Sequence, residues 1–445
     1  METAFNTSLW GDEGFSAILS MKSLPEIIKI IVTDTSPPLW NICEWIVFNT
    51  LGTDEIYIRG LAFTFFLGTV FFTYKIGMHL FSRKTGVLAA LLTFLNPFFF
   101  TYAFEGRMYS IMAFGVSASM YFFLKRRWIP YIIATLWALY SHHFAFFAVF
   151  TQGIWFLYEF AAGERKRATR MFKAFLFVGI GYLPWVMPLY NQTKMVGGGF
   201  WLSTPNLKDL TILLFDYLAS GIKNDSFKIP IIGIPLYQIS LVLVLVGLVT
   251  RNWFKRYKKT LFLLSWFLIP ILATWVISQY FQSIFFNRYL LYTIPAAMLL
   301  LASNRRGSAS TIILSITIFL FALIDYHYFT HPIKLPFREM ATYVKETKTD
   351  RDFLINWNAS SHHLWETKYY GFPSPIYIPP DAGDLPFFVG TALMGDEDVV
   401  RNIPENTERV GVTTSGAIEE ISLPGYTESE VKTLGSLKFV WMEKE

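Results

Sequence analysis

The stretch TGVLAALLTFLNPFFFTYAFEGRMYSIMAFGVSASMYFFL, residues 85–124, decides the fold class of this chain. Its only charged side chains are Glu105 and Arg107, which lie between two long apolar runs. The hydrocarbon core of a bilayer is about 30 Å thick, and a helix needs about 20 apolar residues to cross it. The stretch therefore predicts two membrane helices, at 85–103 and 107–124, joined by a short charged turn.

The composition of the whole chain supports this interpretation. Of its 445 residues, 53% are hydrophobic and 18% are aromatic, whereas only 16% are charged, and the mean hydropathy is +0.38. Such a composition is typical of a membrane protein and unusual for a soluble one. We expect a polytopic α-helical membrane protein, with about 10 spans here and 11 in the full protein. The candidate spans are 56–81, 85–103, 107–124, 128–143, 144–162, 172–190, 231–250, 260–279, 286–302 and 309–329.

The basic residues predict how these spans are oriented. We interpret 128–162 as two short spans that turn near His142–His143, because one long helix would put the basic clusters at 125–127 and 165–167 on opposite sides. The positive-inside rule then makes the basic face cytoplasmic and puts both chain ends outside. The net charge of +5 is an orientation signal, and no nucleic-acid partner is expected. The residues of this basic face are Arg83, Lys84, Lys125, Arg126, Arg127, Arg165, Lys166, Arg167, Arg170, Lys173, Arg251, Lys255, Arg256, Lys258, Lys259, Arg305 and Arg306.

Residues 1–55 are predicted to form an outer segment with short amphipathic helices in the membrane interface. Ser23-Leu-Pro-Glu26 is typical of a capping box that opens the second of these helices, and Pro37–Pro38 ends it. Residues 1–16 have neither the basic nor the apolar region of a signal peptide. Since nothing before residue 56 can carry this segment across, we favour an additional N-terminal span missing from this sequence. The alternative is translocation of the tail by the first span.

Two further regions lie on the expected outer side. Residues 331–445 are charged and rich in turns, which predicts a small α/β domain. The expected strands are 352–357, 376–379, 387–390, 409–414 and 437–442, and the expected helices are 337–348 and 396–403. Residues 191–230 are predicted as a long loop, and three consecutive glycines at 197–199 favour either a mobile lid or a plain connection.

The acidic pair Asp12–Glu13 is the first candidate for chemistry. On a helix, adjacent side chains point about 100° apart, so the pair is not expected to share one proton. One carboxylate could act as a general base while the other orients a substrate hydroxyl, a cation or a metal. The alternative is structural: Asp12 could be the N-cap of a helix that starts here.

Charged residues near the expected outer ends of the spans are the next candidates. Arg288 could bind a phosphate with two hydrogen bonds, or extend its head group to the interface. Glu105 and Arg107 could be functional, because charge near the hydrocarbon is costly, or could pair with each other or with lipid head groups. Arg59 has the same two interpretations as Arg288, and a structural ion pair is favoured there.

Histidine and cysteine give weaker signals. His142–His143 could bind a metal with a third ligand from Asp12, Glu13 or Glu105, although hydrogen bonding to substrate or helix capping is favoured. His362–His363 are expected at the surface, and the single Cys43 is expected to be a packed side chain. The sequence has no P-loop, dinucleotide fingerprint, nucleophile elbow or zinc-protease motif. No cofactor is expected apart from a possible divalent metal.

Several short motifs, in this order and spacing, resemble the GT-C glycosyltransferases of the protein-mannosyltransferase and aminoarabinose-transferase kind (glycosyltransferase family 39-like). The resemblance covers residues 9–291. One departure is Gly106, since the family more usually has Glu-Ala-Arg where this chain has Glu105-Gly106-Arg107. The motifs are Leu9-Trp-Gly-Asp-Glu13, Asp34-Thr-Ser-Pro-Pro-Leu-Trp40, Phe104-Glu-Gly-Arg-Met-Tyr-Ser110, Ser141-His-His-Phe144 and Asn287-Arg-Tyr-Leu-Leu291, together with Gly52 and Arg59.

The resemblance implies transfer of a sugar, with inversion, from a polyprenyl-phosphate donor to a lipid, glycan or protein acceptor on the outer face of the cell membrane. Asp12 matches the catalytic base, Arg107 and Arg288 would hold the lipid phosphate, and Glu13 and Glu105 would shape the site. The remaining substrate-binding candidates are Tyr109, His142, His143 and Tyr289. A secondary transporter or lipid flippase is the main alternative. It would favour internal repeats and ionisable groups at mid-bilayer, and no repeat is evident. A catalytically inactive scaffold is a third interpretation.

Overall fold

The computed structural model describes residues 2–220, 235–251, 256–303, 307–358 and 362–445. They form two compact units. The helical unit comprises Thr35–Trp40 and Arg59–His331, and the mixed unit comprises Met1–Asp34, Asn41–Ile58 and Pro332–Glu445.

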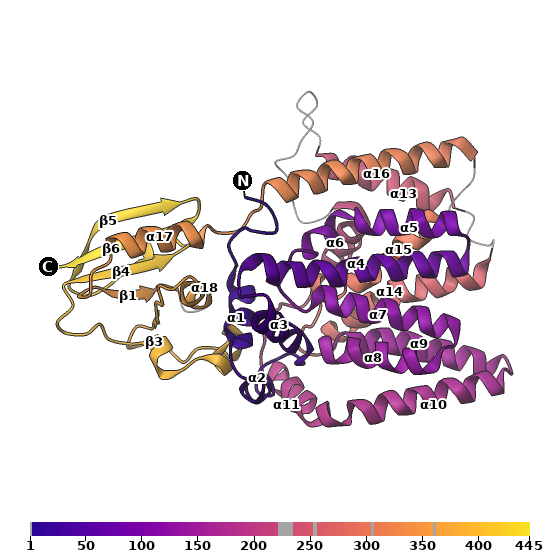
Figure 1. Ribbon diagram of the computed structural model, residues 1–445, viewed down its shortest axis with the longest axis horizontal. Helices are drawn as coiled ribbons and strands as arrows, with labels where there is room; N and C mark the ends of the chain where they lie inside the picture. The colour runs from indigo at the N-terminus through magenta and orange to yellow at the C-terminus, as the bar shows by residue number, and fades with distance from the viewer. Residues whose placement is uncertain (1, 221–234, 252–255, 304–306, 359–361) are drawn as a thin grey trace. The chain divides into compact units, whose positions relative to one another are not determined.

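The helical unit is a bundle of apolar helices that run side by side (Figure 1). Its helices are α4 (Glu55–Leu80), α5 (Arg83–Phe94), α6 (Pro97–Tyr102), α7 (Tyr109–Lys125), α8 (Trp128–Ser141), α9 (Ala145–Ala161), α10 (Arg165–Tyr182), α11 (Val186–Gly197), α12 (Leu207–Phe215), α13 (Leu236–Val249), α14 (Tyr257–Tyr280), α15 (Ile294–Ala302) and α16 (Gly307–Thr330). Among the described residues, four segments are long and apolar enough to cross a membrane: α4, 165–197, α14 and most of α16.

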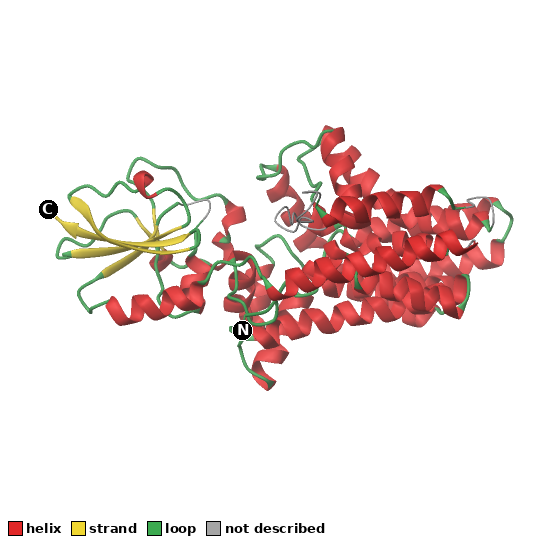
Figure 2. Cartoon of the chain, turned by 90° about the horizontal axis from the view of Figure 1, so that it is seen from above, coloured by secondary structure: helices red, strands yellow, loops and turns green. Residues whose placement is uncertain are grey.

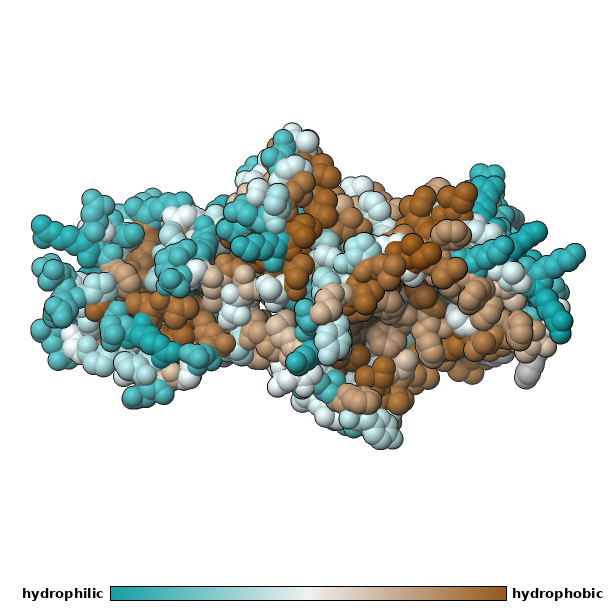
Figure 3. Space-filling view, turned by 90° about the horizontal axis from the view of Figure 1, so that it is seen from below, coloured by the Kyte–Doolittle hydropathy of each residue, from teal (hydrophilic) through white to brown (hydrophobic). Residues whose placement is uncertain are grey.

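The surface of this bundle is apolar. Large side chains such as Leu157, Phe160 and Phe177 are more than half exposed. Figure 3 shows brown, apolar patches on the face of the bundle that it presents. Exposed apolar area of this kind is unfavourable in water and favourable in lipid, so the chain is an integral membrane protein.

Most expected spans correspond to helices, and the turn at His142–His143 separates α8 from α9 as predicted. Two spans are wrong as continuous helices. The span 85–103 breaks after α5, because Pro97 has no amide hydrogen and Asn96 caps a new helix, α6. The span 286–302 begins as two 3-10 turns, at Asn287–Tyr289 and Leu291–Thr293, before α15 starts.

In its described part, the segment expected as a long loop at 191–230 contains helical turns on either side of a non-helical stretch at 198–206. α11 continues to Gly197, and α12 is followed by a π-helical turn at Asp216–Ser220. Residues 221–230 of that loop, and 231–234 of the next span, lie outside the described residues. Asn206 starts α12 because its side chain accepts hydrogen bonds from the backbone N–H groups of Lys208 and Asp209, at 2.7 and 3.2 Å.

The mixed unit contains a β-sheet, whose strands are yellow in Figure 2. The sheet has six strands in the order β3-β2-β1-β4-β6-β5. The strands are β1 (Phe353–Asn356), β2 (Ile376–Tyr377), β3 (Val399–Val400), β4 (Arg409–Thr414), β5 (Tyr426–Leu434) and β6 (Leu437–Lys444). The first four strands in this order pair in parallel, while β6 and β5 add antiparallel strands. Helix α17 (Phe337–Thr347) packs Phe337, Met340 and Val344 against Leu354 and Trp441.

Sequence patterning predicts β1, β2, β4, β6 and α17, and the structure confirms them. The strand at 387–390 is wrong: a 3-10 turn occupies Phe387–Val389. The helix at 396–403 is also wrong, because only Asp396–Asp398 is helical and β3 follows. Strand β5 has no prediction, since it is an edge strand whose mostly exposed, charged side chains hide the alternation of a half-buried strand.

Most of the N-terminal segment packs within the mixed unit, whereas Thr35–Trp40 belongs to the helical unit. It forms α1 (Gly11–Ser20), α2 (Leu24–Ile31) and α3 (Leu39–Thr50), and α1 lies on α18 (Leu364–Tyr369). A Cβ atom at Gly14 would lie 3.1 Å from the backbone of Trp365, so this approach needs glycine. The predicted capping box of α2 is confirmed, because the Ser23 backbone N–H donates to Glu26 Oε2 at 3.0 Å.

Candidate functional site

Arg288 is held by aromatic rings at one end of the helical unit. Its guanidinium lies 4.9 Å from the ring centre of Phe286 and 5.6 Å from that of Tyr109. The turn that carries it is fixed by Tyr217, whose hydroxyl donates to the Asn287 carbonyl. A cation over aromatic faces is stabilised by the negative charge density of the rings, so the guanidinium keeps its position and its charge.

His142 and Tyr289 complete this aromatic cluster. The Tyr289 ring centre is 4.9 Å from those of both His142 and Phe144, and 6.2 Å from that of Tyr109. The structure therefore brings together four of the predicted site residues: Tyr109, His142, Arg288 and Tyr289. Their segments meet because α8 ends at Ser141 and α7 begins at Tyr109, while Tyr292 donates its hydroxyl to the Phe144 carbonyl at 3.0 Å.

The positive charges of Arg107 and Arg288 act on the imidazole of His142. Burial lowers the pKa of this imidazole well below its usual value, and the charges of His143, Arg107 and Arg288 lower it further. Its Nδ1 accepts a hydrogen bond from the Phe144 backbone N–H at 3.1 Å. His142 is therefore neutral at pH 7, and it lies where the fields of Arg107 and Arg288 overlap.

His143 faces a different set of neighbours. Its Nε2 lies 2.7 Å from Gln192 Oε1 on α11, and its Nδ1 lies 3.3 Å from the Tyr182 hydroxyl. Burial lowers its pKa to about 4. His143 therefore connects the start of α9 to α10 and α11, whereas His142 packs in the aromatic cluster around Arg288.

Glu105 and Arg107 lie in the connection between α6 and α7. The Arg107 backbone N–H donates to the Glu105 carbonyl at 2.7 Å, which tightens this turn. Phe104 anchors it, with ring centres 5.1 Å from Phe100 and 5.3 Å from Phe63. Glu105 is 5% exposed, so its carboxylate is held inside the unit. Arg59, on α4, is wholly buried.

The acidic pair belongs to the mixed unit, where the two side chains differ. Glu13 is wholly buried, accepts a hydrogen bond from the Trp10 backbone N–H at 3.4 Å, and lies 3.6 Å from Lys334 Nζ. Lys334 also lies over the Trp10 ring, at 4.7 Å. The interpretation of Asp12 as an N-cap is wrong, because α1 starts at Gly11 and Trp10 is the N-cap. Asp12 is the second residue of the helix and is half-buried.

Two lesser expectations can be checked here. His362–His363 are not surface residues: His363 is 7% exposed, and its Nε2 lies 2.9 Å from the Ser415 hydroxyl. Burial lowers the pKa of His362. Burial, and then the charge of Glu44, raise the pKa of Cys43 to about 11, which agrees with an unreactive packed thiol.

Within the described part of the chain, no group of three or more His, Cys, Asp or Glu side chains is placed to hold a metal ion. Sequence reasoning also missed contacts that surround the candidates. Trp201 lies 5.0 Å from Phe286, and Lys334 reaches Glu13. Both contacts join segments far apart in the sequence, and no local pattern predicts them.

Several solved structures of other proteins are similar to the fold of this chain. No family model and no curated protein sequence matches the chain. ArnT from Cupriavidus metallidurans in the apo state matches over 99% of this chain and 95% of ArnT, with a TM-score of 0.66 at 12% identity. The same protein bound to undecaprenyl phosphate matches with a TM-score of 0.62 at 12% identity, over the same shares of both chains.

A third match is the Archaeoglobus fulgidus oligosaccharyltransferase in complex with Zn and sulfate. It has a TM-score of 0.52 at 13% identity and covers 91% of this chain and 64% of that protein. All of these are GT-C glycosyltransferases. The chain has the GT-C fold. Within this fold, the cluster of Arg288 and aromatic rings belongs to the helical unit and the acidic pair belongs to the mixed unit.

Proposed function

We propose that this protein is a membrane glycosyltransferase that moves a sugar from a polyprenyl-phosphate donor to an acceptor hydroxyl on a lipid, glycan or protein. The observation that carries the proposal is Arg288, held over Tyr109 and Phe286 beside a neutral His142. It occurs in a fold shared with ArnT, which has been solved with undecaprenyl phosphate, and with the archaeal oligosaccharyltransferase AglB, which has been solved with a dolichol-phosphate.

The chemistry needs fixed positive charge at the departing phosphate. As the bond between the sugar and the phosphate breaks, negative charge builds on the phosphate oxygens, and Arg107 and Arg288 stabilise it. Because the rings of Tyr109 and Phe286 already hold the Arg288 guanidinium, little reorganisation accompanies the reaction. His142 is neutral, so it can donate or accept a hydrogen bond without adding a third charge.

The acceptor hydroxyl needs a base. Asp12 is the proposed base: its carboxylate removes the hydroxyl proton while the acceptor oxygen attacks the anomeric carbon from the face opposite the phosphate. The new bond forms as the old one breaks, so the product is inverted. Glu13 fixes the start of α1 through Trp10 and Lys334, and thereby positions Asp12. Glu105, His143 and Tyr289 are proposed to shape the substrate-binding surface, on the side of the membrane expected to be extracytoplasmic.

The test is transfer in vitro by purified full-length protein, with a panel of polyprenyl-phosphate sugars and acceptors. Loss of a general base lowers the rate roughly 10²–10⁴-fold, so Asp12→Asn should be nearly inactive. The matched control is Asp381→Asn, which removes an exposed carboxylate of the same unit and should keep full activity. Full activity of Asp12→Asn would refute the assignment of the base. No transfer by the wild type from any donor would refute the proposed function.

A further inference from the structure

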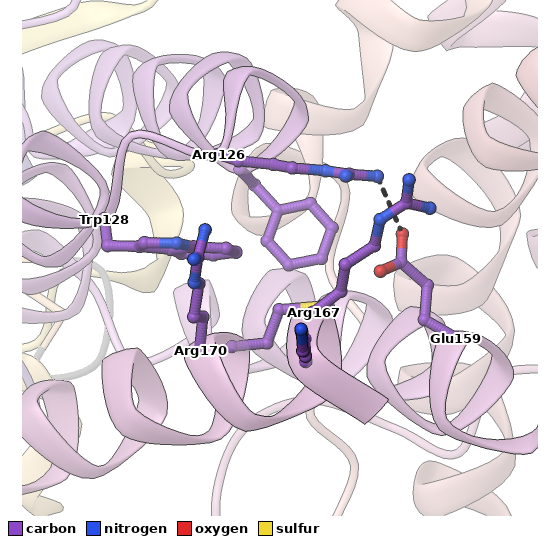
Figure 4. Close-up of a pocket in the computed structure, with 8 residues that line it drawn as sticks. Arg126, Trp128, Glu159, Arg167 and Arg170 are labelled. Carbon is purple, nitrogen blue, oxygen red and sulfur yellow. Dashed lines mark ion pairs between the residues drawn. The ribbon is translucent and has the colours of Figure 1, made fainter. Parts of the chain in front are cut away.

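A second charged site lies at the opposite end of the helical bundle. It is a cavity of about 250 Å³ between the C-terminal ends of α7 and α9 and the N-terminal ends of α8 and α10. Its lining residues are Phe123, Arg126, Trp128, Glu159, Lys166, Arg167, Arg170 and Met171 (Figure 4). We refer to it as the basic pocket.

The basic pocket is separate from the candidate functional site. Tyr109 begins α7 and Lys125 ends it, so at 1.5 Å per residue about 25 Å of helix lies between the two sites. The basic pocket is also on the face that the charge pattern predicts to be cytoplasmic. A ligand bound here would therefore be neither the sugar donor nor the acceptor of the proposed reaction.

The cations of the basic pocket exceed its anions. Arg126 Nη2 lies 3.5 Å from Glu159 Oε1, and Arg167 Nη1 lies 3.1 Å from Glu164 Oε1. Among the described residues, no carboxylate lies within ion-pair distance of Lys166 or Arg170. In Figure 4 the Arg170 side chain extends toward Trp128, while Arg126 extends toward Glu159. Two positive charges of the basic pocket are thus left for an anion.

The position of these charges on α10 is itself unfavourable. The first turn of α10 contains basic residues and no acidic ones, and the N-terminal end of a helix already carries partial positive charge. Glu164, the N-cap, makes no side-chain capping hydrogen bond. An anion in the basic pocket would offset both the helix dipole and the repulsion among Lys166, Arg167 and Arg170.

The surroundings indicate that this anion belongs to a lipid. Apolar side chains beside the basic pocket on α9 and α10 are exposed: Leu157 by 61%, Phe160 by 58% and Phe172 by 57%. Phe160 directly follows Glu159 on α9, and Phe172 directly follows Met171 on α10, so exposed apolar side chains lie next in sequence to two residues that line the cavity. A free anion would use the cations alone, whereas a membrane lipid uses both features.

We propose that the basic pocket binds the phosphate group of an anionic membrane lipid. Arg170 and Lys166 contact the phosphate oxygens, because arginine can donate two parallel hydrogen bonds and lysine supplies a compact charge. Phe123 and Trp128 form the apolar floor, with ring centres 6.4 Å apart. The acyl chains lie along Phe160 and Phe172.

The experiment compares two double variants of the full-length protein in detergent. K166Q/R170Q removes one lysine and one arginine from the basic pocket. R165Q/K173Q removes the same charges from exposed positions of α10 that do not line it. Binding of fluorescent phosphatidylglycerol is titrated for each, with phosphatidylcholine and inorganic phosphate as competitors. Each charged donor that contacts the phosphate directly contributes roughly tenfold to binding, so K166Q/R170Q should bind about 100-fold more weakly than the wild type.

The expected result is that R165Q/K173Q binds like the wild type and that neither competitor at tenfold excess displaces the probe. Equal weakening of both double variants would overturn the proposal, because it would indicate general surface attraction. Competition by phosphatidylcholine would show that the negative charge is not recognised. Competition by inorganic phosphate at the same tenfold excess would show that the site binds a free anion. Unchanged thermal unfolding of both variants provides the check on folding.

Discussion

Arg288 combines a positive charge with a planar group that lies over the rings of Tyr109 and Phe286. Arg288→Gln removes the charge and the guanidinium, and Arg288→Lys keeps only the charge. A hydrogen bond to a charged group contributes about 1.5–3 kcal/mol, so kcat/KM for the lipid-phosphate donor should fall roughly 10–100-fold in Arg288→Gln. Arg288→Lys should lie between this variant and the wild type.

The measurement is the initial rate of transfer at several donor concentrations. Arg351→Gln removes an exposed arginine of the mixed unit and serves as the matched control. Equal rates for Arg288→Gln and Arg351→Gln would show that the cluster does not hold the donor.

In the mixed unit, Arg409 and Asp352 form a two-point ion pair. The distances are 2.6 Å from Nη2 to Oδ2 and 3.0 Å from Nε to Oδ1, and the guanidinium lies 3.9 Å from the Trp441 ring centre. Burial would raise the pKa of Asp352, but hydrogen bonds from Arg409 and Thr349 lower it below its usual value. The pair therefore stabilises the fold above the unfolded-state pKa of about 4, and this stabilisation is lost as the pH falls through the lower folded-state value.

Asp352→Asn should destabilise the full-length protein in detergent at pH 7 by about 1–3 kcal/mol, because the Arg409 charge loses its partner. The difference between variant and wild type should shrink at pH 3, where Asp352 of the wild type is also becoming protonated. Thermal unfolding at both pH values measures this effect. A difference that stays constant between pH 7 and pH 3 would contradict it.

The sequence identifies individual site residues better than it identifies the residues that they contact. Tyr109, His142, Arg288 and Tyr289 belong to short motifs, and the structure brings them together. The partner of Glu13 is Lys334, near the other end of the chain, and no local pattern connects the two. Whether a histidine such as His363 is buried likewise depends on tertiary packing.

Among the elements, the break between α5 and α6 depends on Asn96. Its Oδ1 accepts a hydrogen bond from the Phe99 backbone N–H at 3.0 Å, and its Nδ2 donates to the Tyr217 carbonyl at 2.9 Å. Asn96→Ala loses a cap worth ~1 kcal/mol and a buried hydrogen bond worth ~1 kcal/mol, so unfolding free energy should fall by about 2 kcal/mol. Ser82→Ala, which removes the cap of α5 and a part-buried contact with the Thr85 hydroxyl but no buried bond to another helix, should cost less, about 1 kcal/mol.

Thermal unfolding in detergent measures both changes. Tyr217 also donates its hydroxyl to the Asn287 carbonyl, next to Arg288. Asn96→Ala should therefore also weaken donor binding, whereas Ser82→Ala should not. Equal losses of stability in the two variants would show that the bond to Tyr217 contributes nothing.

The elements divide into those that the sequence predicts and those that it does not. Long apolar helices such as α4 and α14, and short buried strands such as β4, follow from hydrophobic patterning. The 3-10 turns before α15 do not, because an apolar run has the same composition whether it starts as a helix or as turns. Strand β5 is specified by its pairing with β6, and its own side chains carry little of that information.

For the whole molecule, the reaction requires the mixed unit to lie outside and the basic pocket to lie in the cytoplasm. Cysteine labelling tests this, because Cys43 is the only cysteine and can be replaced by serine. In that background, a single cysteine at Asp381 should react with a membrane-impermeant maleimide on intact cells. One at Arg165 should react only after permeabilisation, because its loop belongs to the basic face. Both positions are exposed, so a failure to react reports the compartment.

Labelling of the Arg165 position on intact cells, with protection at position 381, would show that the protein has the opposite orientation in the membrane. Asp12, in the unit that contains Asp381, would then face the cytoplasm, and the proposed transfer on the outer face would be impossible.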